Sequence, residues 1–298
     1  MVIKPIDDKS KRQKLLSELL TSPMLDAEQK KWVKKELNIF NKGIQGEVDS
    51  AHYLDSYFKD SDNYVLLHDL RLVVEDDVAQ IDHLIIARGG NLYLIETKNY
   101  SGNLSINNHG EFTVHYDQDA FGIPSPLEQS RRHERILRKV MFNLKISGRA
   151  DTDLNFLHVV LMHPKAIIQR PLARTFDTSF LIKADQFPTW HQNFVESQSS
   201  LGILKSLINA RSSSTIREWG ELIKNQHQPK GLMDLPDFIN PKPRTQKNAG
   251  VSTSADPQKQ LICAHCGIKI DYAVGQFCWR NPARFNGLQY CREHQALF

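Results

Sequence analysis

Two apolar runs, each interrupted by an acidic residue, constrain the fold of this chain more than any other feature of its sequence. The runs QIDHLIIAR (80–88) and NLYLIETKN (91–99) are rich in apolar and β-branched residues and are separated by a Gly-Gly pair. This pattern predicts two antiparallel strands joined by a tight hairpin. Asp82 lies near the start of the first strand and Glu96 near the end of the second. The hairpin is therefore expected to bring two carboxylates to one edge of a sheet.

The acidic residues of this hairpin predict a metal site. Side chains alternate along a strand, so Glu96 and Lys98 point to the same face. Pairing across a two-residue turn places Asp82 opposite residue 97, and the face of Asp82 then depends on the register or on a bulge. Two buried carboxylates are costly unless a cation neutralises them. Carboxylates are the ligands that Mg²⁺ or Mn²⁺ prefers, and a lysine beside such an ion can offset charge on a phosphate.

The elements expected around the hairpin follow the order helix, three strands, helix, strand. The first helix is expected at 43–58, and strands at 64–73 and 155–163 flank the hairpin in the chain. A second helix of about 20 residues is expected to begin at Pro126. This order predicts an α/β fold, in which helices pack on a mixed sheet.

Composition divides the chain into four parts. Residues 1–40 are predicted to form a charged helical segment of two helices separated at Pro23, and residues 41–226 the α/β domain. Residues 227–260 are rich in Pro, Asn and Gln and have no sustained periodicity, which predicts a linker. Residues 261–298 contain all four cysteines of the chain.

Charge and hydropathy limit the classes of partner. The formal net charge of +4 is too small to indicate nucleic acid unless the charge is localised. No run approaches the roughly 18–20 apolar residues of a membrane span, and the N-terminal residues lack the apolar core of a signal peptide. A cytoplasmic protein without a membrane partner is therefore expected. The sequence does not indicate an oligomeric state.

Three motifs resemble those of the nuclease-related (NERD) domain of the PD-(D/E)xK nuclease superfamily. They are GIQGEVDSAHYL, AQIDHLIIARGGNLYLIETKNYSG and PLEQSRRHERIL, and they follow the order and spacing of that family over residues 40–163. Ile81 stands where the superfamily name has proline, but NERD domains have an apolar residue there. The resemblance implies a restriction-endonuclease-like αβββαβ core.

The resemblance also implies roles for individual residues. Asp82 and Glu96 become the ligands of Mg²⁺ or Mn²⁺, and Lys98 becomes the catalytic lysine. Glu47 becomes an additional acid that completes the metal site or holds a metal-bound water. Gln129 matches a glutamine that faces the same cleft. Glu47 has a simpler interpretation as an acid near a helix N-terminus, and Gln129 as an ordinary first-turn residue.

The helix that contains Gln129 is basic. Helical spacing groups Arg131, Arg135 and Arg138 into a stripe, with Lys139 beside it. A basic surface next to a metal site would suit the phosphate backbone of a nucleic acid. The same stripe is also typical of a solvated helix face, so both interpretations stay open.

The C-terminal cysteines follow a zinc-binding pattern. C-x2-C is followed after 24 residues by C-x2-H, a spacing that lets four side chains reach one Zn²⁺. A segment this short needs metal to fold. The favoured ligands are Cys263, Cys266, Cys291 and His294, and Cys278 in place of His294 is the alternative. The module resembles zinc-ribbon or zinc-finger appendages of DNA-processing enzymes, and its aromatic residues suit either base stacking or its own core.

These observations predict a metal-dependent nuclease that hydrolyses nucleic-acid phosphodiester bonds, with DNA favoured over RNA. A structural Zn²⁺ module would help to bind the nucleic acid. The alternative from another class is a nucleic-acid-binding or regulatory module that retains the nuclease fold without cleavage. A third possibility is hydrolysis of a phosphoester that is not part of a nucleic acid.

Overall fold

The computed structural model describes the chain except residues 101, 117, 150–152, 232–233 and 240–260. It divides into two compact units, Met1–Lys242 and Pro243–Phe298. The predicted domain boundaries at residues 40, 226 and 260 remain predictions. In the described part of the chain, no helix is long and apolar enough to cross a membrane.

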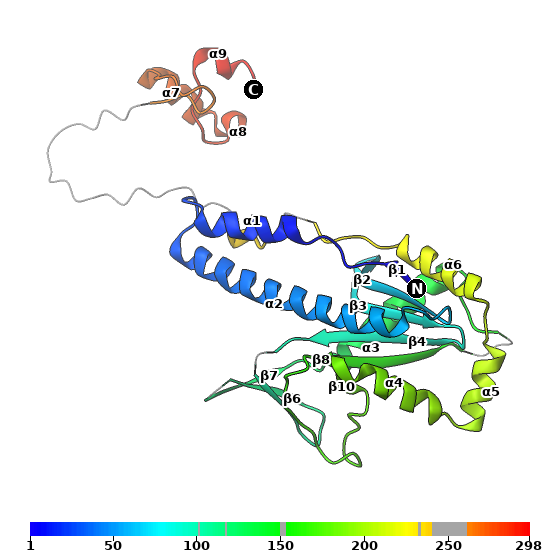
Figure 1. Ribbon diagram of the computed structural model, residues 1–298. Helices are drawn as coiled ribbons and strands as arrows, with labels where there is room; N and C mark the ends of the chain where they lie inside the picture. Colours follow the sequence, from blue (N-terminus) through cyan, green and yellow to red (C-terminus); the bar gives the residue numbers. More distant parts are fainter. Residues whose placement is uncertain (101, 117, 150–152, 232–233, 240–260) are drawn as a thin grey trace. The chain divides into compact units, whose positions relative to one another are not determined.

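The strands of the first unit form two sheets. The larger, six-stranded sheet has the order β1-β2-β3-β4-β8-β10. Neighbours among β2, β3 and β4 are antiparallel, whereas β1, β8 and β10 pair in parallel with their neighbours. These strands are β1 (Val2–Lys4), β2 (Tyr64–Val74), β3 (Asp77–Ala87), β4 (Asn91–Lys98), β8 (Asn155–Met162) and β10 (Leu181–Lys183). The predicted mixed α/β fold is confirmed (Figure 1).

The second sheet has four strands and lies in the chain between β4 and β10. Its order is β7-β6-β5-β9. Its strands are β5 (Asn103–Ile106), β6 (Phe112–Tyr116), β7 (Asp119–Ile123) and β9 (Ile168–Gln169).

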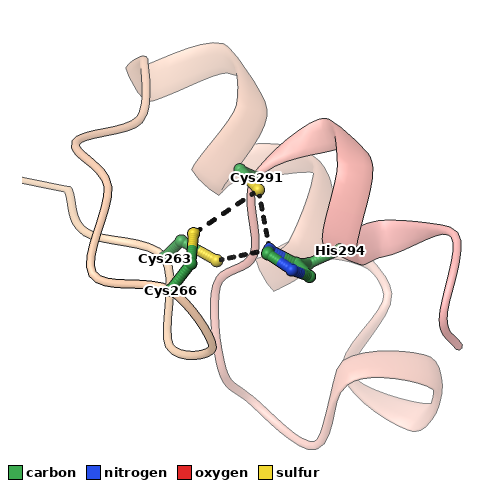
Figure 2. Close-up of side chains that lie close together, drawn as sticks. All are labelled: Cys263, Cys266, Cys291 and His294. Carbon is green, nitrogen blue, oxygen red and sulfur yellow. Dashed lines mark hydrogen bonds between the residues drawn. The ribbon is translucent and has the colours of Figure 1, made fainter.

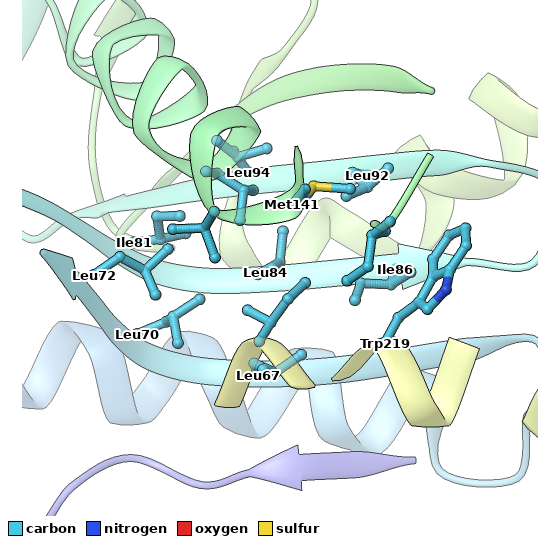
Figure 3. Packing of buried hydrophobic residues seen from close by; sticks show 14 of the residues in the cluster. Leu67, Leu70, Leu72, Ile81, Leu84, Ile86, Leu92, Leu94, Met141 and Trp219 are labelled. Carbon is cyan, nitrogen blue, oxygen red and sulfur yellow. The ribbon is translucent and has the colours of Figure 1, made fainter. Parts of the chain in front are cut away.

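Helices cover both faces of the larger sheet, as strand alternation requires. Leu84 and Leu94 face one side, where they pack with residues of α3 (Pro126–Asn143) and α6 (Ser213–Lys224), including Met141 and Trp219 (Figure 3). Ile85, Tyr93 and Ile95 face the other side, where they pack with α2 (Ala27–Phe58) and α4 (Phe187–Glu196). Full burial of each such side chain contributes about 1.5–3 kcal/mol.

Helix α2 is longer than the sequence indicated. It begins at Ala27 after a capping box formed by Asp26 and Gln29, and it continues without a break to Phe58. The sequence had suggested a helix boundary just before Gly43. A single glycine costs about 1 kcal/mol in a helix interior, which the packing of α2 on α1 (Ser10–Thr21) and on the sheet outweighs.

The first part of the predicted linker contacts the helical segment. Ile239 packs in one cluster with Leu16 of α1 and Val33 of α2. The side-chain amide of Gln29 also donates a hydrogen bond to the backbone oxygen of Phe238 at 2.6 Å. A short 3-10 helix, η2 (Asp237–Ile239), forms here. The remainder of the predicted linker, 240–260, lies outside the described residues.

The remaining elements are short helices. Two of them belong to the first unit, and the others form the second unit. In the first unit, η1 (Ala184–Gln186) precedes α4, and α5 (Ser200–Ile208) precedes α6. The second unit has helices α7 (Tyr272–Arg280), α8 (Pro282–Phe285) and α9 (Arg292–Gln295). Its core contains Leu261, Ile270, Cys278, Phe285 and Tyr290.

Candidate active site and metal centre

The connection between β3 and β4 sets the position of the acidic residues. It spans residues 88–90, and Gly90 has a φ of 85° while its N–H donates to the backbone oxygen of Ala87 at 3.0 Å. This three-residue connection pairs His83 with Ile95, one residue away from the predicted register. Continuing that register puts Asp82 across from Glu96. The two carboxylates therefore share the sheet face that α3 covers.

The strands separate at Asp82. The pairing of β3 with β4 ends at His83, and the backbone N–H of Thr97 donates instead to Oδ2 of Asp82 at 2.7 Å. The pairing of β2 with β3 also skips Asp69, which has a φ of 51°. At this point a side-chain oxygen of Asp82, and not a backbone oxygen of β3, accepts the N–H of β4. This hydrogen bond fixes the Asp82 carboxylate against β4.

Glu96 forms a closed hydrogen-bonded group with Lys98 and Gln129. Its Oε1 accepts from the Lys98 ammonium at 2.6 Å and from the Gln129 side-chain amide at 2.6 Å. The Lys98 ammonium also donates to Oε1 of Gln129 at 3.1 Å. Gln129 lies in the first turn of α3, whose N-terminus is capped by the Ser125 hydroxyl. Helix α3 thereby places the amide of Gln129 within hydrogen-bond distance of Glu96 and Lys98 at the end of β4.

Burial and mutual repulsion raise the pKa values of the acids in this group. Burial raises the pKa of Asp82 well above its usual value, and the charges of Glu96 and Glu47 raise it further. Burial also raises the pKa of Glu96, although Lys98 opposes that change. Burial would lower the pKa of Lys98, but the charge of Glu96 reverses this, and the net shift is upward. Lys98 is therefore an ammonium. Its positive charge does not return the pKa values of Asp82 and Glu96 to their usual range.

Glu47 lies in the same electrostatic cluster but has its own cation. Its Oε2 accepts from the Lys9 ammonium at 2.6 Å, and Lys9 also lies 3.2 Å from Oδ2 of Asp69. Sequence reasoning missed both Lys9 and Asp69. An acid inside the apolar run of β2 was a signal for Asp69, of the kind that singled out Asp82. No local pattern marks Lys9.

His133 is a further neighbour of Glu96 that sequence reasoning missed. Its Nδ1 lies 3.9 Å from Oε2 of Glu96, and burial lowers its pKa to about 4. His133 follows Gln129 by four residues, one helical turn, so helical spacing from Gln129 could have found it.

A buried chain of hydrogen bonds supports the same strands from the α2 face. His68 Nε2 is 2.9 Å from Oδ1 of Asp55, and His68 Nδ1 is 2.8 Å from Nδ1 of His83. His83 Nε2 is 3.1 Å from the hydroxyl of Thr97. With Asp55 as the acceptor of the His68 Nε2–H, the chain has one consistent direction, from the Thr97 hydroxyl to Asp55. His83 is therefore a buried structural residue. It holds the side chain of Thr97, whose backbone N–H donates to Asp82.

The predicted basic stripe on α3 is largely paired with acids. Arg131 is bonded to Glu128, and Arg138 to Glu134 at 2.6 Å. Lys139 lies 3.2 Å from the carboxylate of Asp77 in β3 and 3.8 Å from that of Glu75. Among the described residues, Arg135 has no carboxylate within 4.0 Å. Most of the positive charge of this helix is thus balanced locally.

The second unit contains a compact group of metal-ligand side chains. The ligand atoms of Cys263, Cys266, Cys291 and His294 all lie within 4.8 Å of one another. Figure 2 shows the four side chains converging from the loop after Leu261 and from the start of α9. Three sulfurs and one nitrogen are a donor set that fits tetrahedral Zn²⁺.

Cys278 does not belong to this group. Its side chain is fully buried in the core of the unit, and its sulfur contacts the backbone of Tyr290 at 3.4 Å. Phe285 and Tyr290 are buried in the same core, whereas Trp279 is 39% exposed. The aromatic residues therefore divide between the core and the surface. The structure brings together the Cys₃His set that the sequence favoured.

The first unit thus combines a mixed α/β domain with a partly buried carboxylate–lysine cluster. Comparison with known families identifies it further, because residues 42–163 match the model of the nuclease-related domain, NERD. The chain therefore contains a nuclease-related domain, as its motifs indicated. The match includes Glu47, Asp82, Glu96, Lys98 and Gln129, and excludes Lys9 and the cysteine cluster. No curated protein and no solved structure matches the chain.

Proposed function

We propose that the chain is a metal-dependent nuclease that hydrolyses phosphodiester bonds in nucleic acid. The observation that supports this most is the group formed by Asp82, Glu96, Lys98 and Gln129 inside a nuclease-related domain. DNA is favoured over RNA because the C-terminal module resembles those of DNA-processing enzymes. The alternative is a nucleic-acid-binding or regulatory module without cleavage. The pairing of most of the basic stripe on α3 with acids counts against that stripe as a nucleic-acid contact under either function.

The residues at the first site fit a hard divalent ion. Asp82 and Glu96 offer oxygen donors only, which suits Mg²⁺ or Mn²⁺ better than softer metals. Burial raises the pKa of both carboxyl groups, and the charge of Glu96 raises that of Asp82 further, an effect that a bound cation would oppose. When bound, such an ion would lower the pKa of a water and offset charge that develops on the phosphate.

The protein groups have separate tasks in this proposal. The Thr97 N–H holds Asp82, and Gln129 holds both Glu96 and Lys98, so these positions are fixed before substrate binds. The Lys98 ammonium, whose pKa is raised by Glu96, is charged at neutral pH. It therefore acts as a hydrogen-bond donor and a positive charge toward a non-bridging phosphate oxygen, and not as the base.

The second site fits a structural Zn²⁺. A closed set of four protein ligands leaves no open position for substrate, so its role is to hold the second unit together. Exposed Trp279 and the neighbouring Arg280 give this unit an aromatic ring and a positive charge for a nucleic-acid strand.

A substrate screen tests the proposal. The purified chain is incubated with single- and double-stranded DNA and RNA in Mg²⁺, in Mn²⁺ and in EDTA, alongside Asp82→Asn. The proposal expects cleavage by the wild type that requires the divalent ion and is lost in the variant. Salt-sensitive binding to nucleic acid without cleavage, equal in both proteins, would favour the regulatory alternative. Hydrolysis of a small phosphodiester without cleavage of any nucleic acid would favour the third possibility.

A further inference from the structure

The N-terminal segment contributes a cation to the acidic cluster from outside the nuclease-related domain. Residues 1–9 precede the matched region, which begins at residue 42. The Lys9 ammonium lies 2.6 Å from Oε2 of Glu47 and 3.2 Å from Oδ2 of Asp69. The Lys9 side chain is 17% exposed, so this contact differs from a solvated surface ion pair.

Several contacts on either side of Lys9 fix its position. Strand β1 pairs with β2, and the Lys4 ammonium donates to the backbone oxygen of His68 at 3.0 Å. The backbone N–H of Asp7 donates to the same carboxylate oxygen of Asp69 at 3.3 Å, and Asp7 itself is held by His227 at 2.9 Å. Helix α1 begins directly after Lys9. The ammonium therefore has little freedom to leave the two carboxylates.

The formal charge of the cluster depends on Lys9. The carboxylates are those of Glu47, Asp69, Asp82 and Glu96, and the ammonium groups are those of Lys9 and Lys98. Asp69 and Asp82 both lie at the one break in the pairing of β2 with β3, between His68↔His83 and Leu70↔Ile81, so these groups belong to one cluster. With both lysines present the formal charge is about −2, which one divalent cation balances. Without Lys9 it is about −3, and Glu47 and Asp69 become a second pair of carboxylates without a cation.

We propose that Lys9 is a further active-site residue that fills the cation position beside Glu47 and Asp69, so that the site takes one divalent ion instead of two. The inference rests on the proposed function, because it assumes that Asp82 and Glu96 bind the first ion. In this proposal the Glu47 carboxylate pairs with the Lys9 ammonium and is not a ligand of the divalent ion.

The number of Mn²⁺ ions bound tests this inference. The zinc-loaded chain of 298 residues is titrated with Mn²⁺, and free Mn²⁺ is measured by electron paramagnetic resonance. Lys9→Met keeps the length and apolar stem of the side chain but removes its charge, and Lys11→Met does the same at an exposed position of α1. We expect one bound ion in the wild type and in Lys11→Met, and two in Lys9→Met. Addition of Glu47→Gln to Lys9→Met is expected to return the number to one.

Two results would overturn the inference, and a third concerns the proposed function. Equal numbers of bound ions in the wild type and Lys9→Met, whether one or two, would mean that Lys9 does not occupy an ion position. A second ion that survives Glu47→Gln would place it elsewhere on the protein. An absence of Mn²⁺ binding by the wild type would refute the metal site at Asp82 and Glu96. Circular dichroism and zinc content verify that each variant is folded.

Discussion

Two glycines of one helix should respond to alanine in opposite ways. In α2, a Cβ added at Gly43 meets no described atom within 4 Å, whereas a Cβ at Gly46 would lie 2.6 Å from Cβ of Asn99. Both substitutions gain about 0.5–1 kcal/mol of helix propensity. Asn99 Cβ is attached to the backbone and cannot rotate away, so the strand end itself must shift, at a cost of about 1–3 kcal/mol. We expect Gly43→Ala to stabilise the chain and Gly46→Ala to be about 1–3 kcal/mol less stable than Gly43→Ala.

Urea unfolding followed by circular dichroism measures this difference, with the two variants and the wild type in parallel. Asn99 directly follows Lys98, and its side-chain amide donates to the backbone oxygen of Lys42 at 2.9 Å. Gly46→Ala should therefore also lower cleavage, while Gly43→Ala should leave it unchanged. Equal unfolding free energies for the two variants would refute the close contact between α2 and the end of β4.

Two further predictions concern the metal sites. Because the pKa of Asp82 is raised above its usual 3.8, the folded state holds this proton more tightly than the unfolded state does. Without divalent ions, stability should therefore fall as the pH rises from about 4 toward neutrality. Thermal melts across that range should show a smaller fall for Asp82→Asn, and an equal fall would contradict the assignment. Cys263→Ser should lose the bound zinc measured by mass spectrometry, whereas Cys278→Ser should keep one zinc per chain; loss of zinc in both would contradict the Cys₃His set.

The sequence predicted the parts of the site that lie close together in the chain. Asp82, Glu96 and Lys98 stand on adjacent strands of one hairpin, so an apolar run with an acid in it was enough to find them. The turn geometry was beyond that pattern, because the residues at the turn do not distinguish a two-residue connection at 89–90 from a three-residue connection at 88–90. That difference moved the register by one residue and put Asp82 across from Glu96.

Contacts between distant segments could not be predicted in the same way. Lys9 meets Glu47 across 38 residues of sequence, and neither residue has a local pattern that indicates the other. The continuity of α2 through Gly43 likewise depends on packing against other elements, which outweighs the helix propensity of single residues. The cysteine spacing, by contrast, predicted the Cys₃His set directly, and the structure adds the reason that Cys278 is absent from it.

The dependence of DNA cleavage on Lys98 decides between a nuclease site and a non-catalytic domain. Single-turnover cleavage in Mg²⁺ is compared for the wild type, Lys98→Ala and Lys14→Ala, whose lysine side chain is 78% exposed on α1. We expect a rate about 10²–10³-fold lower for Lys98→Ala, from the loss of one preorganised charge at the phosphate, and an unchanged rate for Lys14→Ala. Cleavage by Lys98→Ala at the wild-type rate, in a folded protein, would contradict a nuclease site built on Asp82, Glu96 and Lys98.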